Sequence, residues 1–323
     1  MKHIIITKNI RDLAIEFRKE LSTGRGTYVP PKTKLADLKN KLTKTKHQQY
    51  VQLIIDLWDD LIIATPADIP AIEKKFSGII KTKAIAKVKS RKGDLLYSQI
   101  VNAMRYDYVQ STIYPNYIVR LGIKTCVYCN AQYAFAVPGT DRYLNYELDH
   151  YLPKSKYPYL CTTFINLQPC CSKCNKKKSA NEPDPKKEEI FRLFMPEGTP
   201  DVPKLFRLSD ASMAKYMATA KSKDLEIIFD YPGNPKMRNG YENFFQISTL
   251  YKAHKDVAEE LLWKKYVYNH IIREIYSDQF KALKFKDKDF NRFILGNYDR
   301  TEDIHKRPLS KMTQDIAKDL DLI

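Results

Sequence analysis

The sequence has no run of about twenty apolar residues, the length that a membrane-spanning helix requires. Its first apolar run, at residues 4–6, is too short for a secretory signal peptide. The pattern GxxxxGK[ST] is also missing, which excludes ATP hydrolysis by a P-loop mechanism. We therefore expect a cytoplasmic protein without membrane contact, in which any ATP-driven step belongs to a separate subunit.

Cysteine is scarce, because the 323 residues include only six, and four of these form two Cys-x-x-Cys pairs. The pairs are Cys126 with Cys129 and Cys171 with Cys174. In a reducing compartment this usage favours metal ligation over disulfides, and two such pairs together provide the four-sulfur ligand set of structural zinc. Cys161 and Cys170 are expected to be small buried residues, with Cys170 an alternative to Cys171 as the ligand.

Acidic residues are too few to balance the basic ones. Lys and Arg number 55 against 38 Asp and Glu, which gives a formal net charge of +17. A charge of this size favours a polyanionic partner, usually nucleic acid. The alternative interpretation is a basic surface that is only solvated.

The length allows two or three domains, and 43% hydrophobic with 29% charged residues is ordinary for a globular protein. Residues 1–121 show the apolar spacing of helices. The clearest repeat is Leu13, Phe17 and Leu21. A helix is predicted to start at residues 65–68, where a capping Thr precedes Pro, and another is predicted over 94–121, broken or kinked at Pro115.

The character of the sequence changes over residues 122–185. Alternating aromatic and apolar residues at 132–137 and 142–148 predict short strands joined by a turn. Residues 186–323 are expected to be helical again, with one long helix over 252–280. The apolar stripe predicted for that helix is Val257, Leu261, Leu262, Ile271, Ile272 and Ile275. The expected architecture is therefore mostly α, with a small α+β insert between helical flanks.

Three segments of the insert carry a family resemblance. They are Leu148–Ser155 (LDHYLPKS), Asn166–Cys171 (NLQPCC) and Cys174–Ser179 (CNKKKS), set within the paired cysteines. In this order they closely resemble HNH endonucleases that contain structural zinc. More narrowly, they resemble the HNH proteins of bacterial antiphage systems such as Septu and some retrons. The resemblance implies a ββα-metal core and an effector that works with a separate ATPase or sensor subunit.

The chemistry of phosphodiester hydrolysis agrees with this resemblance. The reaction needs a base to activate water and a cation to neutralise charge on the phosphate. His150 is the natural base, because an imidazole is largely neutral yet still basic at cellular pH. Asp149 supplies a hard oxygen ligand suited to Mg²⁺ or Mn²⁺. The resemblance assigns Asn166 to positioning the base through its loop, and Asn175 to the second metal-facing position.

Adjacent residues on a regular strand point to opposite faces, so we expect the strand to end or bulge at Asp149–His150. Lysines crowd the second cysteine pair, and Lys154, Lys173 and Lys178 are predicted to contact nucleic acid. The alternatives are a zinc-containing protein that only binds nucleic acid and an adaptor whose zinc core is architectural. The sequence favours neither DNA nor RNA by base readout, because hydrolysis at such a site depends on phosphate.

Overall fold

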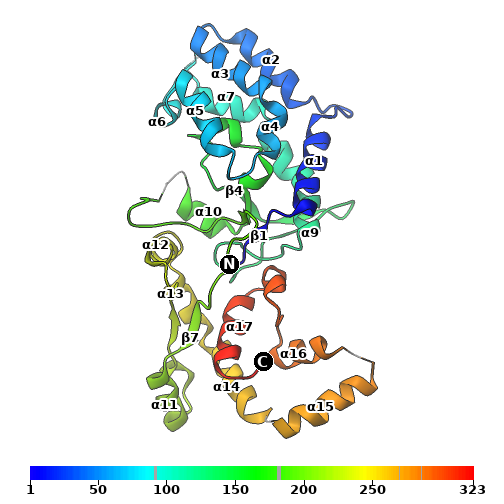
Figure 1. The fold of residues 1–323 in the computed structure, drawn as a ribbon, viewed down its shortest axis with the longest axis vertical. Coiled ribbons are helices and arrows are strands. Elements are labelled where there is room, and N and C mark those ends of the chain that lie inside the picture. Colours follow the sequence, from blue (N-terminus) through cyan, green and yellow to red (C-terminus); the bar gives the residue numbers. More distant parts are fainter. Residues whose placement is uncertain (91–92, 180–182, 269, 285) are drawn as a thin grey trace.

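The computed structural model describes residues 1–90, 93–179, 183–268, 270–284 and 286–323. Most of these residues are helical, with small two-stranded sheets between the helices, as the sequence predicts. N-terminal helices lie at one end of the molecule and C-terminal helices at the other, with β4 and α10 between them (Figure 1). Over the described ranges, none of the helices has both the length and the apolar character needed to cross a membrane.

The N-terminal helices surround an aromatic core. They are α1 (Lys8–Ser22), α2 (Pro31–Lys41), α3 (Thr45–Asp56), α4 (Trp58–Ile63), α5 (Ile69–Ile79), α6 (Thr82–Ile85), α7 (Leu96–Ala103), α8 (Tyr106–Tyr108) and α9 (Tyr114–Arg120). Phe76 of α5 stacks on Tyr159, with ring centroids 3.8 Å apart. The Thr163 hydroxyl donates to the Leu61 carbonyl at 2.8 Å. These contacts hold the loop that follows β4 against the N-terminal helices.

Two predicted helix boundaries are wrong. Residues 65–68 form a turn in which the Asp68 carboxylate accepts hydrogen bonds from the backbone N–H and hydroxyl of Thr65, and α5 begins only at Ile69. The helix predicted over 94–121 is interrupted at Arg105, whose φ of 60° is left-handed, and by a π-helix at Val109–Ile113. Pro115 is the second residue of α9, directly after the π-helix, so the helix changes its hydrogen-bond pattern beside this proline, which has no N–H to donate.

The central strands form two antiparallel pairs. They are β2 (Phe135–Val137) with β3 (Tyr143–Asn145), and β4 (Glu147–His150) with β5 (Leu167–Cys170). The strand predicted over 142–148 is divided at Tyr146, so its two parts belong to different sheets. Helix α10 (Ser172–Lys178) follows β5 and packs on β4. Pro169 lies within β5, where it is tolerated because each strand of a two-stranded sheet has a free edge.

The remaining strands form two small sheets, and further helices follow in the C-terminal half. The sheets are β1 (Ile4–Ile5) parallel to β6 (Phe194–Met195), and β7 (Phe206–Leu208) antiparallel to β8 (Ile227–Phe229). The helices are α11 (Asp210–Thr219), α12 (Pro235–Gly240), α13 (Ile247–Tyr251), α14 (Lys255–Val267), α15 (His270–Ala282), α16 (Asp287–Leu295) and α17 (Ser310–Asp319).

The long helix predicted over 252–280 is two helices, α14 and α15, that separate at Tyr268. Asn269, within the predicted span, lies outside the described residues. Leu261 and Leu262 are buried as predicted, but Ile271 and Ile275 are 54% and 50% exposed. The predicted core stripe is therefore wrong for α15.

The three predicted regions are joined by backbone contacts. Strand β1, near the N-terminus, pairs with β6 beyond the insert. The Lys124 amide donates to the His305 carbonyl at 2.8 Å, and the Leu309 amide donates to the Asn130 carbonyl at 2.6 Å. Both flanks therefore support the central region, and its independence as a domain over 122–185 stays a prediction.

Candidate active site and cysteine cluster

The four paired cysteines form one cluster. The Sγ atoms of Cys126, Cys129, Cys171 and Cys174 all lie within 4.8 Å of one another. The first pair precedes Asn130, which adopts a left-handed φ of 52° and donates through its side chain to the Ile304 carbonyl at 2.9 Å. The second pair is held by the start of α10, for which Cys171 is the N-cap. Four sulfurs at this separation could hold a metal such as zinc.

Strand geometry separates the two candidate ligands that are adjacent in sequence. Cys170 is the last residue of β5, is fully buried, and does not belong to the four-sulfur cluster, whereas Cys171 does. Neighbouring strand residues point to opposite sides, so only one of them faces the cluster. Burial raises the pKa of the Cys161 thiol to about 12 and that of Cys170 well above its usual value. Both leftover thiols are thus buried and protonated.

Asp149 is held in a buried polar network. Its Oδ2 accepts a hydrogen bond from the Tyr128 hydroxyl at 2.5 Å, and the Lys178 ammonium lies 2.9 Å from the same oxygen. Gln168, opposite Asp149 in the β4–β5 pair, donates to the Tyr128 hydroxyl at 2.6 Å. No hydrogen bond within the described ranges uses Oδ1 of Asp149. One oxygen of this carboxylate is therefore left for another ligand.

His150 lies on the opposite face of β4. Its Nε2 lies 2.9 Å from the Cys161 carbonyl, and its ring packs on Tyr106 at a centroid distance of 4.6 Å. Because a carbonyl only accepts, Nε2 carries the proton and Nδ1 is the basic nitrogen. Burial, followed by the charge of Lys154, lowers the pKa of His150 to about 3. The imidazole is therefore neutral at cellular pH.

The β4 strand ends at His150 without a bulge. The pairing with β5 stays regular through Asp149↔Gln168 and His150↔Leu167. The expected end of the strand is confirmed, and the alternative of a bulge is wrong. The Lys178 ammonium also donates to the backbone carbonyl of His150 at 2.5 Å, so it holds the end of β4, while the His150 ring lies on the other face.

Asn166 braces the loop that follows His150. Its Oδ1 accepts from the Leu152 amide at 2.8 Å, and its Nδ2 donates to the carbonyls of Leu152 and Leu160 at 3.1 and 3.0 Å. The Tyr151 amide donates to the Asn166 carbonyl at 2.8 Å. Both ends of the amide thus hold the loop that follows the candidate base.

Of the remaining predicted residues, Lys173, Asn175 and Lys178 belong to α10, and Lys154 lies in the loop after β4. Asn175 is partly exposed and lies one turn before Lys178, so it shares the side of the helix that faces β4. Lys173 is exposed, and the Lys154 ammonium lies 4.1 Å from the centroid of the Tyr106 ring. Lys178 is only 1% exposed, so it offers no surface to a phosphate and acts inside the site.

Sequence reasoning missed three residues of this network: Tyr106, Tyr128 and Gln168. Tyr106 donates to the Leu148 carbonyl and packs on His150, and it comes from α8, far from any motif. Gln168 also clamps the following segment, because its Oε1 accepts from the Leu193 amide at 2.6 Å. Two of the three could have been found from their place in the motifs. Tyr128 lies between the cysteines of the first pair, and Gln168 lies two residues after Asn166.

Comparisons with known proteins show a similarity over part of the chain. No family model matches the chain, and no solved structure matches it at a significant level. Over 74 residues the chain is 36% identical to the Septu protein PtuB of Bacillus thuringiensis. That segment is 23% of this chain and 26% of the relative, so about a quarter of each protein is compared. The match supports a Septu-related defence protein.

Proposed function

We propose that this protein is a metal-dependent HNH endonuclease that hydrolyses phosphodiester bonds of nucleic acid, with DNA favoured, as the effector of an antiphage defence system. One observation carries the proposal: Lys178 of α10 contacts both Asp149 and His150 at the end of β4, next to the four-cysteine cluster. The order β4, β5, α10 fits the ββα-metal core that the HNH resemblance implies. The partial PtuB relation supports the defence role.

The residues have the chemistry that hydrolysis requires. His150 would accept a proton from the attacking water at Nδ1, because Nε2 is bound to the Cys161 carbonyl. Its low pKa would rise when an anionic phosphodiester lies beside it, since negative charge favours the imidazolium. Asn166 would hold the loop and, with it, the orientation of the base.

The oxygen atoms present fit a hard divalent cation. Oδ1 of Asp149 and the amide oxygen of Asn175 would hold Mg²⁺ or Mn²⁺, and the thiolate cluster, which is softer, would hold zinc. When bound, the divalent cation supplies stabilisation of the charge that develops on the phosphate. The ion pair with Lys178 fixes the position of the Asp149 carboxylate, while Lys154 and Lys173 would contact the phosphate backbone.

A cleavage assay tests the proposal. Purified protein would be incubated with Mg²⁺ and plasmid, linear DNA or total RNA, with and without EDTA. We expect cleavage that EDTA abolishes and that His150→Asn abolishes. His47→Asn is the matched control, because His47 is also a buried histidine but lies on α3. Binding without cleavage in every condition, including with a partner subunit, would favour the non-catalytic zinc-containing binding or adaptor protein.

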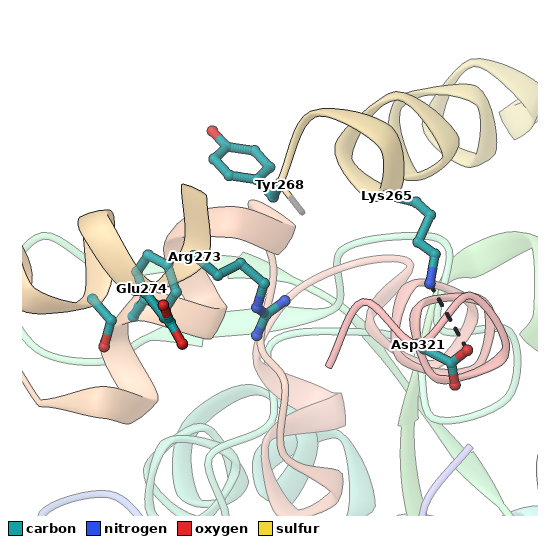
Figure 2. Close-up of a pocket in the computed structure, with 7 residues that line it drawn as sticks. Lys265, Tyr268, Arg273, Glu274 and Asp321 are labelled. Atoms are coloured by element: carbon teal, nitrogen blue, oxygen red, sulfur yellow. Dashed lines mark ion pairs between the residues drawn. The ribbon is translucent and has the colours of Figure 1, made fainter. Parts of the chain in front are cut away.

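A separate ATPase or sensor subunit belongs to the same proposal, and the C-terminal helices offer a surface for it. Six apolar side chains of α14–α16 are at least half exposed: Trp263, Tyr266, Val267, Ile271, Ile275 and Phe293. Exposed apolar groups on this scale mark protein interaction sites. A cavity of about 680 Å³ opens beside them, lined by Arg273, by Phe290 and by Lys265, which pairs with Asp321 at 3.8 Å (Figure 2).

Co-expression with neighbouring genes tests the partner proposal. Size-exclusion chromatography should show a complex that Ile271→Asp disrupts. Val119→Asp is the control, because Val119 is equally exposed, at 50%, but lies on α9. If the chain stays monomeric beside its neighbours and cleaves freely alone, the partner proposal fails while the nuclease proposal stands.

A further inference from the structure

The β2–β3 hairpin has an inverted pattern of side chains. Tyr133 and Val137 point outward and are 53% and 43% exposed, and Phe135, between them, is partly exposed. The alternate residues Ala134 and Ala136 are 0% and 7% exposed and face the core, where β2 packs on α9. A sheet with one solvated face normally turns polar residues outward and large apolar ones inward. Here the large side chains face solvent, so this face is built for contact.

Strand β3 adds a further aromatic ring to the same face. Tyr143 is the cross-strand partner of Val137 and is 58% exposed. Its ring lies 5.8 Å from that of Phe135, which in turn lies 6.0 Å from that of Tyr133. We call these residues, Tyr133, Phe135, Val137 and Tyr143, the hairpin platform.

Two basic residues lie beside the hairpin platform. Thr125 forms an isolated β-bridge with Tyr133, and Lys124 directly precedes Thr125. Arg142 directly precedes Tyr143. Lys124 and Arg142 are both exposed. Over residues 122–178 eight Lys and Arg stand against three Asp and Glu, a net charge of +5. The hairpin is also firmly held, because Arg142 and Tyr146 donate to the carbonyls of Ser111 and Gln110 in the π-helix.

The hairpin platform continues directly into the candidate active site. Only Tyr146 separates β3 from β4, which carries Asp149 and His150. Asp149 is the sixth residue after Tyr143, so the two are at most about 20 Å apart along an extended chain. A ligand on the hairpin platform would therefore lie within a few nucleotides of a scissile phosphate.

We propose that the hairpin platform stacks unpaired bases of a single-stranded segment of the nucleic-acid substrate, an inference that rests on the proposed nuclease function. Exposed aromatic rings bordered by lysine and arginine bind single strands by base stacking and backbone attraction. A base pair in a continuous duplex has no free face for such rings. The basic border and the short connection to β4 favour nucleic acid over a protein partner, which the apolar surface of α14–α16 suits better.

Binding in a non-cleaving background tests the proposal. In the His150→Asn protein, affinity would be measured for a labelled single-stranded oligonucleotide and for a blunt duplex of the same sequence. The oligonucleotide would contain 2-aminopurine, whose fluorescence is quenched by stacking. Replacing Tyr133 and Tyr143 together by Ala should weaken single-strand binding at least about tenfold and remove the quenching, with duplex binding unchanged. Replacing both by Phe should preserve both signals, since the rings remain.

Tyr266→Ala serves as the control, because this tyrosine is 61% exposed but lies on α14. The proposal is overturned if the double Ala variant binds single strands like its parent, if it loses single-strand and duplex binding equally, or if it loses only the partner subunit. The two proposals can fail separately. If the protein with His150 intact cuts nothing, while the double Ala variant loses single-strand binding, the hairpin platform is supported and the nuclease proposal is rejected. If the double Ala variant with His150 intact cleaves normally and its single-strand binding is unchanged, the nuclease proposal is supported and the hairpin platform is rejected.

Discussion

The Lys178 ammonium lies 2.9 Å from the Asp149 carboxylate, and the two side chains are 1% and 7% exposed. A buried ion pair of this kind contributes little net stability, but removing one partner leaves an uncompensated charge. The pair joins the last turn of α10 to the end of β4, so it holds the candidate active site together.

Lys178→Met should therefore lower the free energy of unfolding by about 3–5 kcal/mol, measured by urea denaturation. The double change Asp149→Asn with Lys178→Met should recover part of that loss, because no charge remains buried alone. Lys173→Met, on the exposed side of the same helix, should change stability by no more than about 0.5 kcal/mol. Equal effects for the two lysines would mean that the ion pair is not buried in solution.

The cysteine cluster predicts one zinc ion per chain. Cys171→Ser should abolish stoichiometric zinc and lower the melting temperature, because metal binding at such sites contributes folding free energy directly. Cys170→Ser should keep its zinc, because Cys170 lies outside the cluster. Elemental analysis of the two purified variants checks this, and the opposite pattern would assign the ligand to Cys170.

His150→Asn should reduce the cleavage rate by about a hundredfold to ten-thousandfold, the usual contribution of a positioned base. Zinc content should not change. His150→Ala should also cost about 1–3 kcal/mol of stability, because it leaves the Cys161 carbonyl without its hydrogen bond. Single-turnover cleavage and thermal unfolding of both variants separate the catalytic loss from the structural one. Wild-type cleavage by His150→Asn would remove His150 from the mechanism.

Acid should destabilise the fold through His305. Burial, followed by the charge of the N-terminal amine, lowers the pKa of His305 to about 3, against about 6.5 in an unfolded chain. Between these values the unfolded chain binds more protons, so stability is lost as pH falls from about 6.5 toward 3. His305→Gln should reduce the dependence of unfolding free energy on pH by up to about 1.4 kcal/mol per unit in that window. Identical slopes for the two proteins would contradict this.

Sequence patterns were enough to predict the parts of the site that are local in the chain. The spacing of the cysteine pairs predicted which thiols cluster, because two residues between cysteines let one short turn present both sulfurs to one point. The short strands near 132–148 were also predicted, because the alternation of side chains depends only on neighbouring residues. For the same reason, the mostly helical character of the flanks followed from apolar spacing.

Contacts between residues that are distant in the chain could not be predicted in this way. Lys178 looked like one more surface lysine, yet the packing of α10 on β4 buries it against Asp149. Tyr106 reaches the site from α8, a segment without a motif, so no local pattern could indicate it. Ile271 and Ile275 fit a helical stripe, but burial also requires a neighbouring element to cover it, and none of the described residues does so fully. Periodicity specifies which side of a helix is apolar, and only the folded chain specifies what that side contacts.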